Sequence, residues 1–452
     1  MDFLDKLILP QSAEHIKLLH YIITLVLSLF IPFISIIFGG TFLSIYYGKR
    51  FRKNSDLNYQ KLSRDIIEYV TVNNGVGVIL GLVPLLTSIL LFAQIVHTAK
   101  IDTVSLIAIA FIFVTVALVM IYTYRHSLAV SFVFNSVDSK KIQDKSAEEE
   151  FAKLKNSSSH LSLKYGRLGL VFLFIGIWFF IAGITSVELF TSWNYSSIFT
   201  ALAAPKVLLN LLIFICFAFS LTAAAILFIY LYWKEDKEND SLHYKEFVKN
   251  KLSKLGLQFA IPLPLLIAIN LLSLSDKNLS GSVFVYSLIA ILLIFLSYHF
   301  FFMLKVKNEY KFSALIFFVL ILASVSLIIK DQKAISNATK YHSLVLSTEY
   351  DKVLAELKGE GKVAAISGKE IYDVRCASCH KFNQKLVGPA HFDVLPKYVG
   401  KEAQLVAFIR NPVKVNPAFP PMPNPGLKPQ EAEAVAKYLL DEFDKYEKSL
   451  KK

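Results

Sequence analysis

The sequence predicts an all-α protein: a polytopic membrane bundle of about eight helices, followed by a small helical domain outside the membrane. Hydrophobic residues make up 54% of the 452 residues, more than an ordinary soluble protein contains. They gather in runs long enough to cross a bilayer, which takes ~20 residues. From residue 331 onward the composition becomes that of a soluble protein. We therefore expect a membrane domain over 1–330, a linker over 331–360 and a separate domain over 361–452.

The eight expected spans are each bounded by charged or turn-forming residues. They cover approximately 18–46, 76–96, 104–122, 168–189, 207–231, 255–274, 283–303 and 314–329. Pro262 and Pro264 lie inside the sixth span, where the missing backbone N–H groups predict a kink, and Pro84 predicts another in the second. Before the first span, residues 2–9 form a short amphipathic segment suited to the membrane interface. This segment carries a single lysine where a cleavable signal peptide has a basic region, so we expect no signal peptide.

The distribution of Lys and Arg predicts the orientation of the bundle. Roughly two dozen of these residues fall in the connections after spans one, three, five and seven, and about five fall in the others. Because basic connections stay in the cytoplasm, both ends of the chain should lie outside, in a bacterial inner membrane with the C-terminal domain on the periplasmic side. The formal charge of +13 is then explained by membrane topology, so lipid is the expected contact and nucleic acid is not.

The C-terminal region contains one motif with a specific chemistry, Cys376-Ala377-Ser378-Cys379-His380. Two cysteines three residues apart share one face of a helical turn, and a histidine follows. This spacing suits a haem bound through two thioether bonds, with His380 as an axial iron ligand. The alternatives are a chance CxxC or half of a zinc site, which would need further Cys or His at ligand spacing. The remaining cysteine, Cys216, lies in an apolar run.

Residues around this motif resemble those of a small, mono-haem class I cytochrome c over about a hundred residues. The matching residues are a glycine-containing helix before the motif, a Gly-Pro turn after it and a last helix with a small packing face: Gly368, Ile371, Tyr372, Val387-Gly388-Pro389, Ala434, Tyr438 and Leu439. The resemblance implies that Gly368 lets two helices cross closely. It also implies that the carbonyl of Pro389 fixes the imidazole of His380. One covalent haem c is the expected cofactor.

The same resemblance implies a methionine as the second axial ligand, in a loop before the last helix. Met422 is the only methionine after Met303, and it lies in a proline-rich segment, 416–426. Proline restricts φ and stiffens such a loop, which helps to hold a weakly binding thioether. His391 is the competing ligand. With His380 and Met422 on the iron, no coordination position stays open, so the haem would carry single electrons.

Two histidines in the membrane domain are candidates for a further haem. His20 starts the first span and His97 ends the second, so both fall near the outer surface and could hold a b-type haem. Ordinary interfacial histidines, which need no ligand role, are the alternative. The first two spans resemble the large subunit of cytochrome bd quinol oxidases. The resemblance rests on His20, on the basic residues at 48–50 where the first span ends, and on the glycine-rich stretch 75–81 that opens the second. The fifth span, however, lacks the histidine that this family uses for a second haem.

The sequence leaves three functions open. The first is a membrane-anchored c-type cytochrome that is a subunit of a respiratory or other electron-transport complex. It would exchange electrons with a soluble or membrane redox protein, and quinol is a candidate electron donor. The second is an enzyme in its own right, a quinol oxidase-like or quinol dehydrogenase core with b-type haems and a fused cytochrome. The third is a transporter or assembly scaffold with a redox-sensing haem. The absence of evident inverted repeats argues against the third.

Overall fold

The computed structural model describes residues 11–99, 101–136, 145–195, 197–233, 242–307, 309–358 and 367–450. Over these ranges the chain is helical and contains no strand, which confirms the all-α prediction. The chain divides into two compact units, His20–Ala338 and a C-terminal unit that comprises Thr339–Lys452 with the chain up to Leu19. The amphipathic segment expected at 2–9 lies outside the described residues.

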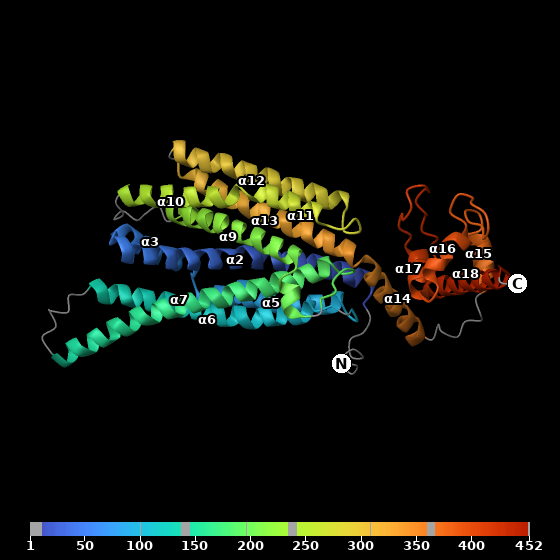
Figure 1. The fold of residues 1–452 in the computed structure, drawn as a ribbon, viewed down its shortest axis with the longest axis horizontal. Coiled ribbons are helices and arrows are strands. Elements are labelled where there is room, and N and C mark those ends of the chain that lie inside the picture. The colour runs from blue at the N-terminus through green and yellow to red at the C-terminus, as the bar shows by residue number, and fades with distance from the viewer. Residues whose placement is uncertain are drawn as a thin grey trace. The chain divides into compact units, whose positions relative to one another are not determined.

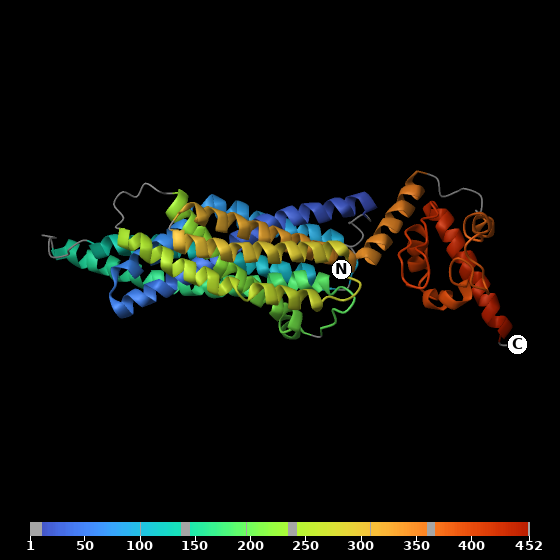
Figure 2. The same cartoon turned by 90° about the horizontal axis from the view of Figure 1, so that it is seen from above.

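Within the described residues, eight helices are long and apolar enough to span a membrane, as predicted. Figures 1 and 2 show them running alongside one another. In chain order the spans are α2 (Ala13–Asn54); α4 (Asn74–Gly77), η1 (Val78–Leu82) and α5 (Val83–Ile95) together; α6 (Thr103–Ser136); α7 (Lys145–Glu188); α9 (Pro205–Leu227) with η3 (Phe228–Trp233); α10 (Leu242–Ala260) with α11 (Leu263–Leu272); α12 (Gly281–Lys307); and α13 (Lys311–Ala338).

Helices α6 and α7 approach each other closely along a stripe of glycines. Gly169, Gly176 and Gly183 recur every seven residues on α7, the repeat that keeps one face of a helix against its neighbour. A Cβ atom at Gly176 would lie only 2.8 Å from the Val114 side chain on α6. Small residues at such positions let backbones pack tightly in lipid, where apolar burial does not drive association.

The prolines interrupt the sixth span, whereas the second span stays helical past Pro84. Helix α10 ends at Ala260, and α11 starts at Leu263, one residue after Pro262. The Tyr298 hydroxyl donates a hydrogen bond of 2.7 Å to the Ala260 carbonyl, which has lost its helical partner. In the second span, the π-helical turn η1 ends at Leu82, two residues before Pro84. Pro32 lies inside α2 without interrupting it.

Two further helices lie outside the expected spans. Helix α3 (Leu57–Val70) follows the first span and is amphipathic, and the Tyr244 hydroxyl on α10 donates a 2.9 Å hydrogen bond to Asp65 on α3. Helix α14 (Lys340–Leu357) occupies much of the stretch expected as a linker, and α13 itself continues past residue 330 to Ala338.

The C-terminal unit consists of helices: α14, α15 (Gly368–Arg375), α16 (His391–Val394), η5 (Leu395–Tyr398), α17 (Glu402–Arg410) and α18 (Pro429–Leu450). Its apolar core is formed mainly by α15, η5, α17 and α18. Helix α14 packs on α17 and α18, and the Arg410 guanidinium forms a 2.6 Å ion pair with Asp351 of α14.

Helices α15 and α18 cross at Gly368, as the resemblance implied. A Cβ atom at Gly368 would overlap the backbone carbonyl of Ala434. Four residues further along α15, the Tyr372 ring packs against the Tyr438 ring, with centroids 5.6 Å apart. The crossing therefore depends on the missing side chain at residue 368.

Replacing Gly368 by alanine should destabilise the C-terminal unit by about 1–3 kcal/mol, because rigid backbone must move away from the new methyl group. The effect is measured as the midpoint of thermal unfolding of this unit. Limited proteolysis of the full chain at increasing temperature detects the unfolding. Gly281→Ala is the control, since no atom lies within 4 Å of a Cβ atom there. Equal midpoints for both variants would contradict the role of Gly368.

Candidate haem site

The CxxCH motif follows directly after the end of α15 and forms a helical turn. The Cys376 N–H donates to the Tyr372 carbonyl at 2.8 Å. The N–H groups of Cys379 and His380 both donate to the Cys376 carbonyl, at 3.1 and 3.0 Å. Both cysteines are free of disulfide bonds, and burial raises the pKa of the Cys376 thiol. The turn thus presents two thiols and an imidazole within five residues.

Four of the five predicted site residues line one cavity: Cys376, His380, Pro389 and Met422. Its empty space is about 1140 Å³, including the part that is open to solvent. The walls are mainly apolar and come from η5, α17, α18 and the loop before α18: Leu395, Leu405, Phe408, Ile409, Phe419, Val435 and Leu439. Cys379, the second cysteine of the motif, is half-buried beside it.

The imidazole of His380 is held in one orientation. Its Nδ1 lies 3.2 Å from the Pro389 carbonyl oxygen. Since a carbonyl can only accept, Nδ1 carries the proton in this hydrogen bond and Nε2 keeps its lone pair, the arrangement that suits a metal ligand. Gly388 packs against the ring so closely that a Cβ atom there would overlap it. The Gly-Pro turn therefore orients the ring through both its carbonyl and its missing side chain.

His391, the alternative ligand, packs on His380 face to face. The two ring centroids are 4.9 Å apart, and the planes are inclined by only 19°. Tyr372 and Phe382 also contact the His391 ring, each at 5.5 Å. Burial, followed by the charge of His380, lowers the pKa of His391 to about 3. The ring is therefore neutral at physiological pH, and its Nε2 has no hydrogen-bond partner.

Two side-chain turns brace the loop that carries Met422. The Asn416 side chain accepts a hydrogen bond from the Ala418 N–H at 2.9 Å, and the Asn424 side chain accepts one from the Gly426 N–H at 2.9 Å. Gly426 has a positive φ of 66°, which favours glycine. Met422 lies between these two turns and lines the cavity.

These residues fit a covalently attached haem. The cavity combines a buried thiol, an imidazole with an available Nε2, a thioether and apolar walls. The missing side chain at Gly388 leaves room for the His380 ring. The zinc alternative gains no support, because the described residues contain no group of three or more His, Cys, Asp and Glu suited to a metal ion.

The membrane histidines lie on separate elements. His20 is in the first turns of α2, and His97 is in the turn after α5. Among the described residues no contact joins the two rings. The His20 Nδ1 is buried without a hydrogen-bond partner, and His97 is 8% exposed. A b-type haem at this pair therefore stays a prediction.

Comparison with known proteins finds relatives of the C-terminal unit. Residues 363–439 match the family model described as cytochrome c oxidase, cbb3-type, subunit III. Cytochrome c-551 of Pseudomonas denitrificans is 37% identical over 79 residues, which are 16% of this chain and 95% of the relative. Cytochrome c-551 of Pseudomonas aeruginosa is 36% identical over 70 residues, 15% of this chain and 67% of the relative.

These matches all fall in the C-terminal unit, and they lend no support to the likeness between the membrane spans and cytochrome bd. The family model covers both Gly368 and the CxxCH turn. A domain of this family implies a haem c cofactor and electron transfer. Through its C-terminal domain, the chain belongs to the class I cytochrome c family.

Proposed function

We propose that the chain is a membrane-anchored c-type cytochrome that relays single electrons as a subunit of an electron-transport complex, to or from an extracytoplasmic partner. The observation that carries the proposal is the cavity that joins Cys376, His380 and Met422 in a domain of the cytochrome c family. Eight helices suited to a membrane supply the anchor. The matched family model is named for an oxidase subunit, which favours a role inside a larger complex.

In this proposal one haem c is attached through Cys376 and Cys379. His380 binds iron through Nε2, because the Pro389 carbonyl occupies the Nδ1 proton. Met422 supplies the sixth ligand from its braced loop. When bound, the haem exchanges one electron at a time. With His380 and Met422 both holding the iron, the group would transfer electrons and would not bind a substrate.

The geometry around His380 favours Met422 over His391 as the sixth ligand. Two side chains that held the same iron would each have to direct a donor atom at it. His391 instead lies flat against the face of the His380 ring, with centroids 4.9 Å apart. His391 therefore packs on the face of the His380 ring and supports it there.

The arrangement of the spans supports the orientation proposed for a bacterial inner membrane. Eight spans return the chain to the side on which it started, and the helix ends that precede the basic connections, those of α2, α6, η3 and α12, lie at one end of the bundle (Figure 1). With that end in the cytoplasm, the N-terminus and the cytochrome domain are on the periplasmic side.

We expect purified protein to contain one covalently bound haem per chain. Alkaline pyridine haemochrome spectra, set against protein concentration, measure both the amount and the type of haem. A ratio above one, with b-type absorption, would contradict a single haem. That result would instead favour a b-type haem at His20 and His97, and with it the quinol oxidase-like alternative.

Replacing Met422 by leucine should leave the haem attached but abolish the sulfur-to-iron absorption band and lower the reduction potential, because an apolar side chain cannot bind iron. His391→Phe is the matched control, since a phenyl ring preserves the stacking on His380, and its band should persist. The opposite pattern, with the band lost only in His391→Phe, would show that the ligand assignment is wrong.

Replacing Gly388 by alanine should tilt or displace the His380 ring, at a cost of about 1–3 kcal/mol in the stability of the haem-bound domain. The visible spectrum and the temperature of haem-domain unfolding report the change. Val387→Ala serves for comparison, because Val387 is 52% exposed. If both variants behave like the original protein, the ring is not held by Gly388.

A further inference from the structure

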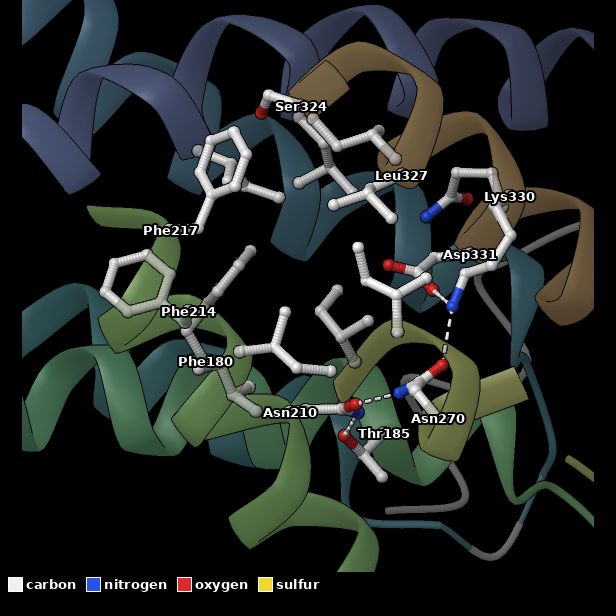
Figure 3. Close-up of a pocket in the computed structure, with 18 residues that line it drawn as sticks. Phe180, Thr185, Asn210, Phe214, Phe217, Asn270, Ser324, Leu327, Lys330 and Asp331 are labelled. Carbon is white, nitrogen blue, oxygen red and sulfur yellow. Dashed lines mark hydrogen bonds and ion pairs between the residues drawn. The ribbon is translucent and has the colours of Figure 1, made fainter. Parts of the chain in front are cut away.

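A cavity in the membrane unit lies among α2, α7, α9, α11 and α13, apart from the haem site (Figure 3). Its empty space is about 880 Å³, including the part open to the surroundings. Most of the wall is apolar: Leu27, Ile31, Phe180, Ile184, Phe214, Phe217 and Leu327. Aromatic and branched side chains of this kind accommodate an apolar ligand, or the apolar part of one.

One end of this cavity carries a chain of hydrogen bonds that links four helices. The Asn210 amide donates to the Thr185 hydroxyl at 3.0 Å, and the Asn270 amide donates to the Asn210 carbonyl oxygen at 2.5 Å. The Lys330 ammonium donates to the Asn270 side-chain oxygen at 2.7 Å, and it pairs with Asp331 at 2.5 Å. Figure 3 shows this chain running along the wall of the cavity.

The charges around the polar end balance. Lys330 is 3% exposed and is neutralised by Asp331. Lys206, which donates to the Asn270 backbone carbonyl at 2.9 Å, pairs with the buried Glu188 at 3.4 Å. Each cation therefore has a carboxylate of its own, as charges inside a membrane require. A phosphate or another anion would meet no surplus positive charge here, so the site favours a neutral head group.

Gln332 supplies the observation that points to a ligand. It lines the cavity and is only 4% exposed. Neither its Nε2 nor its Oε1 has a hydrogen-bond partner. A buried amide with both groups unpaired lowers stability, and such groups call for an explanation in terms of an absent partner. The amide offers one donor group and one acceptor to whatever occupies the cavity.

The polar end lies where the spans end on one side of the bundle. Thr185 is one turn from the C-terminal end of α7 at Glu188, and Asn270 lies two residues before α11 ends at Leu272. Asn210 is in the second turn of α9. Gln332 lies in the last turns of α13, the helix after which the chain continues into the C-terminal unit. In the proposed orientation this is the extracytoplasmic side.

The ligand must therefore be lipid-soluble, neutral and able to hydrogen-bond in both directions. A quinone accepts hydrogen bonds through its carbonyl oxygens, and a quinol donates them through its hydroxyls. A primary amide serves both, because its NH₂ group donates to the first and its oxygen accepts from the second. Phe214 and Phe217 offer aromatic faces for a ring, and the aliphatic wall suits an isoprenoid tail.

We propose that this cavity binds the head group of a membrane quinone or quinol, with Gln332 as a direct hydrogen-bonding residue beside the polar wall that Lys330, Asn270 and Asn210 form. The proposal deepens the proposed function by naming the class of lipid-soluble redox partner, and it rests on that function for its physiological meaning.

The test is equilibrium binding to the purified full-length holoprotein in lipid nanodiscs. Decylubiquinone and a short-chain menaquinone analogue are the probes, and bound probe is measured after separation of free probe. Wild-type protein should bind one of them saturably, at one per chain. Gln332→Leu should weaken this binding about tenfold or more, which corresponds to the loss of one or two hydrogen bonds.

Gln332→Leu is an informative variant because the amide it removes has no protein partner, so folding should not suffer. Gln258→Leu is the matched control, since Gln258 is an exposed glutamine on α10 and lies outside this cavity. Leu327→Trp, which fills the cavity with a larger ring, should abolish binding by a different route. Thermal unfolding of each variant establishes that the fold is kept.

Saturable binding that fails in Gln332→Leu and Leu327→Trp but persists in Gln258→Leu supports the proposal. Absence of saturable binding to the wild type, or equal binding by all four proteins, overturns it. So does lipid extraction of the purified protein that yields a phospholipid from the cavity, displaced by neither probe. The readout involves no electron transfer, so the haem spectra described above can fail or succeed independently of it.

Discussion

Polar groups inside a bilayer have no water to bond with, and this constraint shapes the membrane unit throughout. It explains why every described span is helical, since a helix pairs its own backbone. It also explains why Tyr298 reaches the Ala260 carbonyl where Pro262 interrupts the sixth span, and why Lys330 and Lys206 each have a carboxylate beside them. Against this background Gln332 stands out, because its buried amide is unpaired at both ends.

The number of spans could be predicted from the sequence because apolar length alone decides whether a helix can cross a bilayer. Helices α3 and α14 could not be found in this way. Both carry polar residues along much of their length, and each is held by neighbours remote in sequence, α3 through Asp65 and Tyr244 and α14 through Asp351 and Arg410. The effect of a proline was also only partly predictable, since Pro32 leaves α2 continuous whereas Pro262 breaks the sixth span.

The two candidate sites differ in how much the sequence reveals. The CxxCH residues are contiguous, and their helical turn follows from spacing, so both the motif and its expected cofactor could be read directly. The steric part played by Gly388 and the stacking of His391 depend on how the chain folds back on the turn. The cavity at Gln332 draws its polar wall from four spans. Single polar residues such as Asn210 and Asn270 inside apolar runs were the one available signal, and their pairing emerges only in three dimensions.

The restraint on His380 bears on how fast an electron can move. The imidazole is fixed at its Nδ1 by Pro389, on one face by His391 and by the close packing of Gly388 beside Cε1. If His380 binds iron as proposed, an imidazole held in this way would keep the same position whether or not the metal carries the extra electron. The reorganisation energy would then be small, because a preorganised site needs little rearrangement when charge moves. A partner with only a modest difference in potential could exchange electrons with such a domain in either direction.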